Sequence, residues 1–100
     1  MNIKKLWILL VYEIHLSKTY KKQYDKLSKK DKDLTDNIIK RLANDEVLEE
    51  KYKDHALQGS LKGFRDCHIK SDLVLVYKKD KNILILTCVS IANHNNSFKK

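Results

Sequence analysis

Apolar residues in the first half of the chain recur at the interval of an α-helix. Behind Ser17 and again behind Ser28, apolar side chains return every three or four residues, as one buried helix face requires. Serine is a favoured N-cap residue, and Ser28 with Asp31 has the spacing of a capping box. The pattern therefore predicts two consecutive amphipathic helices, the second ending near Asn44. Their apolar positions are Tyr20, Tyr24 and Leu27, followed by Leu34, Ile38, Ile39, Leu42 and Ala43.

The remaining apolar residues form runs that are typical of β-strands. Residues 8–16 make one run before the helices, and residues 64–69, 73–77 and 83–91 make three runs after them, separated by short polar turns. Residues 45–63 carry few apolar side chains, and we expect a loop that could include a short helical turn. The order predicts an α+β fold: an N-terminal strand, a two-helix hairpin and a three-stranded antiparallel meander. The sheet would have four strands, with the helices on one face.

A length of 100 residues corresponds to a single domain over residues 1–100 with one modest core. Residues 1–10 could be an N-terminal extension, because the strand opening at Tyr12 is complete without them. Their apolar stretch is too short for a membrane span, and no small-residue cleavage site follows it. Cys67 and Cys88 lie in apolar, strand-like sequence, which favours buried, reduced thiols and a cytoplasmic location.

Charge is the first indication of a partner. The chain has 21 Lys and Arg residues against 13 Asp and Glu residues, a net charge of +8 and a pI near 9.5. Such a field attracts polyanions, chiefly nucleic acid or the ribosome surface. A lysine-rich surface that serves only solubility is the alternative that charge alone leaves open.

Residues 54–77 concentrate unusual residue types in and just before the strand predicted at residues 73–77. They contain Gly59 and Gly63, the two glycines of the chain, and two of its four histidines. Glycine adopts backbone conformations that other residues avoid. We therefore expect the two glycines to let the loop turn sharply and bring His55 back over the strand that carries His68.

Strand periodicity places the candidate catalytic groups on one side of the sheet. Alternate residues of a strand point to opposite faces, so His68 shares a face with Asp66, whereas Arg65 faces the other way. Asp72 follows in the next turn, close enough to orient His68 or pair with it. An imidazole beside a carboxylate supplies the parts of general acid–base catalysis.

Several catalytic classes lack their motifs in this chain. It contains no GxxxxGK, GxGxxG or GxSxG motif, which excludes the common nucleotide-binding loops and the serine-hydrolase elbow. The histidines and cysteines show no metal-ligand spacing, so we expect no metal. Cleavage of RNA remains, because the 2′-OH is a built-in nucleophile that needs only a base, an acid and a cation. The residue types for this reaction are present at His55, His68, Asp72, His94 and Arg65, with Phe98 as a ring for base stacking.

These residues resemble the YafQ branch of the RelE/ParE toxin superfamily over about residues 12–98. The similarity rests on the runs DHALQG from Asp54, LKGFRDCHI from Leu61 and DLVLVY from Asp72, and on His94 and Phe98 near the end. The opening YEIHLSKTYKKQYDKL also resembles the first strand and helix of these toxins.

The resemblance implies the toxin of a type II toxin–antitoxin system: a ribosome-dependent mRNA endoribonuclease that uses no metal or other cofactor. It also implies inhibition by a DinJ-like antitoxin with a ribbon-helix-helix part, a monomeric free toxin, a hetero-oligomer with the antitoxin and no membrane association. Carried onto this chain, the catalytic residues are His55, His68, Asp72, His94 and Phe98. The residues expected to bind RNA phosphates are Arg65, Lys62, Lys18, Lys21, Lys22 and Lys26.

Two positions near the C-terminus depart from the family pattern. Ser90 stands where the family often carries an arginine, and Ala92 replaces a glycine. Loss of that cation removes one group that would stabilise transition-state charge. Two alternatives to an active nuclease therefore remain: a binding-only relative that contacts the ribosome or the antitoxin, and a ParE-like gyrase poison on the same fold. The sequence does not decide which histidine is the acid and which is the base.

Overall fold

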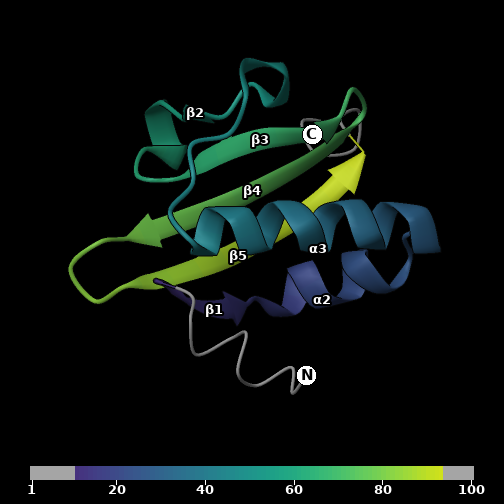
Figure 1. Cartoon of the computed structure of the whole chain (residues 1–100), viewed down its shortest axis with the longest axis horizontal. Coiled ribbons are helices and arrows are strands. Elements are labelled where there is room, and N and C mark those ends of the chain that lie inside the picture. The colour runs from purple at the N-terminus through teal and green to yellow at the C-terminus, as the bar shows by residue number, and fades with distance from the viewer. Residues whose placement is uncertain (1–10, 94–100) are drawn as a thin grey trace.

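The computed structural model describes residues 11–93 of the chain (Figure 1). Nine elements follow one another, and η denotes a short 3-10 turn. They are β1 (Glu13–Leu16), α2 (Lys18–Asp25), α3 (Lys29–Ala43), η1 (Glu50–Tyr52), β2 (His55–Ala56), η2 (Gly59–Leu61), β3 (Arg65–Lys70), β4 (Leu73–Asp80) and β5 (Ile85–Asn93).

The strands form one mixed sheet in the order β1-β5-β4-β3-β2, with both helices on one face (Figure 1). β3, β4 and β5 are the antiparallel meander that the sequence predicts, and β1 pairs with β5 in parallel. The prediction of an α+β fold is therefore confirmed, but the expected count of four strands is wrong. The fifth strand, β2, has two residues and lies in the segment 45–63 expected to be a loop. Two residues are too few to show a hydrophobic period.

Two strand boundaries also differ from the prediction. β4 continues to Asp80, so the turn falls at residues 81–84 and not at residues 78–82. The carboxylate of Asp80 accepts hydrogen bonds from the backbone N–H groups of Asn82 and Ile83, which closes this later turn. The first strand is described from Glu13 to Leu16, and residues 8–10 of its predicted range lie outside the described residues.

The helices begin where the serines predict. Ser17 Oγ accepts a hydrogen bond from the backbone N–H of Tyr20 at 3.0 Å, and Ser28 Oγ accepts one from Asp31 at 3.1 Å. Each cap satisfies one of the backbone donors that a helix leaves unpaired at its start. On α3, Leu34 is 38% exposed, whereas Thr35 is fully buried among the apolar residues that contact the sheet. The prediction that Leu34 lies on the buried face is therefore wrong, because the next residue, Thr35, occupies the buried position.

A single core fills the space between the helices and the sheet. The strands contribute alternate residues to it, including Cys67, Leu75 and Cys88, all with no exposed surface. Both cysteines are free and buried, as predicted. Because these alternate positions face the helices, the positions between them face away, and this places His68 on the opposite side from Cys67.

Both glycines occupy positions where the backbone has a positive φ angle. Gly59 has a φ of +67° and Gly63 a φ of +99°, and they flank the loop that turns β2 back towards β3. The turn is closed by a hydrogen bond of 2.9 Å from the N–H of Leu57 to the carbonyl oxygen of Phe64. As expected from the sequence, the loop returns His55 to the strand that carries His68.

Candidate active site on the histidine face

The face of the sheet opposite the helices, which we call the histidine face, collects the candidate catalytic groups. Residues paired between neighbouring strands point to the same side of a sheet, so the register defines rows of side chains across this face. One row is His55, Asp66, Val76 and Ser90, and the next is His68, Val74 and Ala92. His68 follows Asp66 by two residues on β3, about 7 Å along the strand. His55 lies beside Asp66 on the neighbouring strand, so His55 and His68 are diagonal neighbours on this face, where a base and an acid can lie on either side of a phosphate.

His55 is held on this face by two oxygen atoms. Its Nδ1 lies 2.7 Å from the carbonyl oxygen of Lys53 and 3.3 Å from Oδ1 of Asp66. A carbonyl oxygen only accepts hydrogen bonds, so Nδ1 carries the proton and Nε2 of the neutral ring is the basic nitrogen. The side chain of Asp66 is 2% exposed, while that of His55 is 55% exposed. The arrangement is a buried carboxylate behind an accessible imidazole.

His68 is half-buried on the same face, at the end of β3. It also borders a cavity whose other walls come from η1, from α3 and from the turn between β3 and β4. His68 is therefore positioned between Asp66, two residues earlier on its own strand, and the space at the outer edge of β3.

Asp72 lies exposed in the turn between β3 and β4. Its Oδ2 accepts a hydrogen bond of 3.4 Å from Nδ2 of Asn93, the last residue of β5. This contact joins the β3–β4 turn to the end of the final strand, immediately before His94 in the sequence. His94 and Phe98 themselves lie outside the described residues.

Arg65 points away from the histidine face, as strand periodicity predicts. Its Nε lies 3.2 Å from Oδ1 of Asp54 and 3.3 Å from the hydroxyl of Tyr77, and that hydroxyl donates to Asp54 at 2.6 Å. Burial, together with the hydrogen bond to Asp54, raises the pKa of Tyr77 far above its usual value. The cluster anchors Asp54, the residue just before His55. The structure therefore does not bring Arg65 together with the two histidines.

The predicted phosphate-binding lysines lie on exposed surface. Lys18, Lys22 and Lys26 are spaced by four residues along α2 and its end, so they follow one another along one side of the helix. Lys21 is exposed beside them, and Lys62 is exposed just after η2. Within residues 11–93, none of these five lysines forms an ion pair.

Sequence reasoning placed Asp66 on the correct face but did not select it as a site residue. It favoured Asp72 because that residue is near His68 in the chain. The pairing of His55 with Asp66 depends on β2, which the pattern could not detect. The available signal was the shared face of Asp66 and His68, which follows from the two-residue period of a strand.

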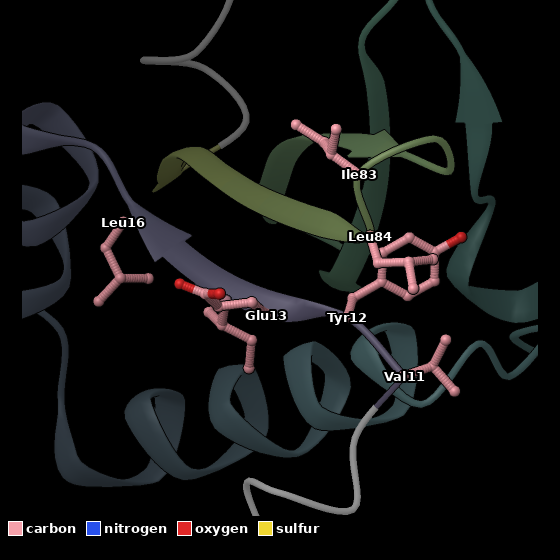
Figure 2. A pocket seen from close by; sticks show the side chains of 7 residues that line it. Val11, Tyr12, Glu13, Leu16, Ile83 and Leu84 are labelled. Carbon is pink, nitrogen blue, oxygen red and sulfur yellow. The ribbon is translucent and has the colours of Figure 1, made fainter.

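A second hollow on the surface lacks the groups for this chemistry. A groove of about 690 Å³ runs along β1 and the turn between β4 and β5 (Figure 2). Its walls are apolar apart from Tyr12 and Glu13, and it holds no histidine or lysine. Across residues 11–93 there is no cluster of three metal-binding side chains. No helix in that range is long and apolar enough to cross a bilayer.

Known structures share this architecture. The toxin of the Escherichia coli DinJ–YafQ toxin–antitoxin complex superposes with a TM-score of 0.77 at 32% identity, covering 89% of this chain and 99% of that one. A metal-bound toxin from Helicobacter pylori superposes with a TM-score of 0.71 at 37% identity, covering 85% and 97%. The fold is thus that of the RelE/ParE-like toxins.

The sequence comparisons narrow this class to one family. Residues 12–99 match the family described as the bacterial toxin of type II toxin–antitoxin systems, YafQ. The chain belongs to this family. The mRNA interferase toxin YafQ of Escherichia coli K12 is 39% identical over 77 residues, which cover 72% of this chain and 82% of that protein.

Proposed function

We propose that this protein is an endoribonuclease that cleaves mRNA on the ribosome, in the cytoplasm, as the toxin of a toxin–antitoxin pair. The observation that carries the proposal is the accessible imidazole of His55, backed by the buried carboxylate of Asp66, on the same face as His68. The similar E. coli protein that is named an mRNA interferase supports the choice of substrate.

In this mechanism His55 is the general base. Its Nε2 takes the proton from a ribose 2′-OH, and the resulting oxygen attacks the neighbouring phosphorus. Asp66 stabilises the imidazolium that forms, because a buried carboxylate near Nδ1 favours the charged ring. The bond from phosphorus to the 5′-oxygen breaks as a 2′,3′-cyclic phosphate forms. Either His68 or His94 gives the leaving oxygen its proton, and no metal enters the reaction.

The other predicted residues have supporting roles. Asp72, linked to Asn93, would hold the turn beside His68 and the start of the C-terminal segment in a fixed relation. Phe98 would stack on a base of the mRNA. Lys18, Lys21, Lys22, Lys26 and Lys62 would contact RNA phosphates. In place of a direct phosphate contact, Arg65 would fix Asp54 and the backbone that leads to His55.

We further propose a DinJ-like antitoxin with a ribbon-helix-helix part as the inhibitory partner. Solved complexes of E. coli YafQ with DinJ support this assignment. The toxin would be a monomer when free and a hetero-oligomer with the antitoxin. Co-expression of such an antitoxin should restore growth to cells that express the toxin.

The decisive experiment maps the 5′ ends of mRNA by primer extension on ribosomes. Wild-type protein should create new ends within the reading frame. His55→Ala and His68→Ala should abolish the ends, whereas His15→Ala should not, because His15 lies on β1 and bonds only to Glu13 among the described residues. Full cleavage by His55→Ala would contradict the mechanism, and full cleavage by His68→Ala would assign the role of the acid to His94.

A binding-only toxin is the second candidate, and one observation favours it. Ser90, where the family often has an arginine, lies in the same row as His55 and Asp66. A missing cation so near the base would slow the reaction by loss of charge stabilisation. Stalled ribosomes without new 5′ ends would identify this function, and DNA damage without mRNA loss would identify a ParE-like gyrase poison.

A further inference from the structure

A cavity of about 580 Å³ lies beyond the outer edge of β3. Within the described residues β2 pairs only with Arg65 and Asp66, so the second half of β3 has no neighbouring strand on that side. The space is enclosed instead by η1, the end of α3 nearest the turn between β3 and β4, and that turn. Its walls are Leu34, Lys51, Tyr52, Lys53, His68, Ile69, Lys70 and Ser71.

The walls of this cavity carry positive charge and no carboxylate. Three of them are lysines, and only Lys70 has an ion-pair partner in the described structure, Asp31 at 3.1 Å. Lys51 and Lys53 form no ion pair within residues 11–93. By contrast, the groove along β1 contains a glutamate, and the cavity beside Arg65 contains three carboxylates together with three cations. The chemistry of the walls therefore suits an anion.

Tyr52 orients one of these cations. Its half-buried ring packs against the core, and the ammonium of Lys51 lies 5.2 Å from the ring centre. The guanidinium of Arg41 lies 5.9 Å from the same centre. Such cation–π contacts restrain a flexible lysine side chain. Because two cations already contact the ring, it serves better as a support for positive charge than as a platform for a base.

Lys53 joins the cavity to the proposed active site. Its backbone has a φ of +49°, and its carbonyl oxygen is the one that bonds Nδ1 of His55. On the other wall, the side chain of His68 borders the cavity directly. An anion bound here would thus contact elements that carry both proposed catalytic histidines.

We propose that this cavity binds a phosphodiester group of the substrate RNA, next to the phosphate that is cleaved. The proposal rests on the proposed nuclease function, since it is the substrate strand that must pass between His55 and His68. Lys51 and Lys53 supply the charge, and contacts of this kind fix the register of a strand without reading its bases. Ribosomal RNA carries the same chemistry and is the other source of such a phosphate.

Titration with a 2′-O-methyl RNA tetranucleotide, followed by NMR, tests the site without cleavage, because a methylated 2′ oxygen cannot attack. We expect the amide signals of residues 51–53 and 70–71 to shift. Lys51→Gln combined with Lys53→Gln should weaken binding about tenfold and reduce the slope of log Kd against log salt by about 0.7, the value for one phosphate contact on a single strand. The charge-matched pair Lys40→Gln and Lys81→Gln should leave both quantities near wild type. Equal losses in the two pairs, or no shift at residues 51–53 at millimolar RNA, would overturn the proposal.

Binding to empty ribosomes separates the two sources of phosphate. If the cavity holds the substrate strand, the Lys51 and Lys53 variant should bind empty ribosomes as tightly as the control pair does. A loss on empty ribosomes as large as the loss on the tetranucleotide would assign the phosphate to ribosomal RNA and contradict the proposal. Since the tetranucleotide is never cleaved, its binding is informative even if primer extension finds no nuclease activity.

Discussion

The hydroxyl of Tyr77 offers a direct test of how the loop carrying His55 is anchored. Tyr77 is 1% exposed, and its hydroxyl donates to the carboxylate of Asp54 over 2.6 Å. Tyr77→Phe removes this hydrogen bond and the longer one, of 3.3 Å, that the hydroxyl accepts from Nε of Arg65, and it leaves the ring in the core. We expect the variant to be less stable, because Asp54 loses its shortest partner.

The magnitude follows from the charge and exposure of the partners. A hydrogen bond to a charged group contributes about 1.5–3 kcal/mol to stability. The side chain of Asp54 is 21% exposed and keeps Arg65 at 3.2 Å, so water and the guanidinium replace part of the lost interaction. The free energy of unfolding should therefore fall by about 1.5–2 kcal/mol, at the lower end of that range.

Urea unfolding followed by circular dichroism measures this difference. Tyr52→Phe is the matched control, because the hydroxyl of the half-buried Tyr52 forms no hydrogen bond with the described residues, and it should change stability by less than about 0.5 kcal/mol. A double-mutant cycle with Asp54→Asn should recover most of the Tyr77 effect as coupling energy. A Tyr77→Phe variant as stable as Tyr52→Phe would refute the anchoring role of this hydroxyl.

Three further predictions concern stability. Thr35→Val should raise the free energy of unfolding by about 1 kcal/mol, and with it the melting temperature, because the fully buried hydroxyl has no hydrogen-bond partner within residues 11–93. Thr35→Ser, which keeps the hydroxyl, should raise neither quantity. Gly63→Ala should lower the free energy of unfolding by about 1–2 kcal/mol, because Gly63 has a φ of +99°, which alanine adopts only with strain. This cost is not steric, since no atom lies within 4 Å of the added Cβ. Ser60→Ala should leave the free energy of unfolding nearly unchanged in the same urea titration. Burial raises the pKa of Cys88 from 9.0 to about 12, so the folded state holds this proton more tightly than the unfolded chain. Stability should fall as pH rises from 9 to 12, by about 1.4 kcal/mol per pH unit from this thiol, and Cys88→Ala should show a shallower fall in unfolding experiments across that range.

The anchoring cluster and the histidine face lie on opposite sides of the same short segment of chain. Asp54 is bonded on the helix side to Tyr77 and Arg65, while His55, the next residue, pairs with Asp66 on the other side. Consecutive residues of an extended chain point to opposite faces, so the bonds that hold Asp54 also set the direction of the His55 side chain. A two-residue strand can in this way hold the side chain of His55, the proposed general base, in a fixed direction.

The sequence by itself determined the features that depend on neighbours within a few residues. The helices follow from a spacing of three to four residues and from caps at Ser17 and Ser28, both of which act within one turn. The opposite directions of His68 and Arg65 follow from the two-residue period of a strand. The requirement for glycine at positions 59 and 63 reflects a local turn that needs positive φ.

Only the tertiary structure decided which distant residues meet. The pairing of His55 with Asp66, the parallel pairing of β1 with β5, and the cavity that combines Leu34, Lys51 and His68 all join segments far apart in the chain. Such contacts depend on strand register and on how the helices pack on the sheet, and no short-range pattern records either. For the same reason the sequence led to Asp72, the carboxylate near His68 in the chain, and did not indicate that the fold places Asp66 beside His55.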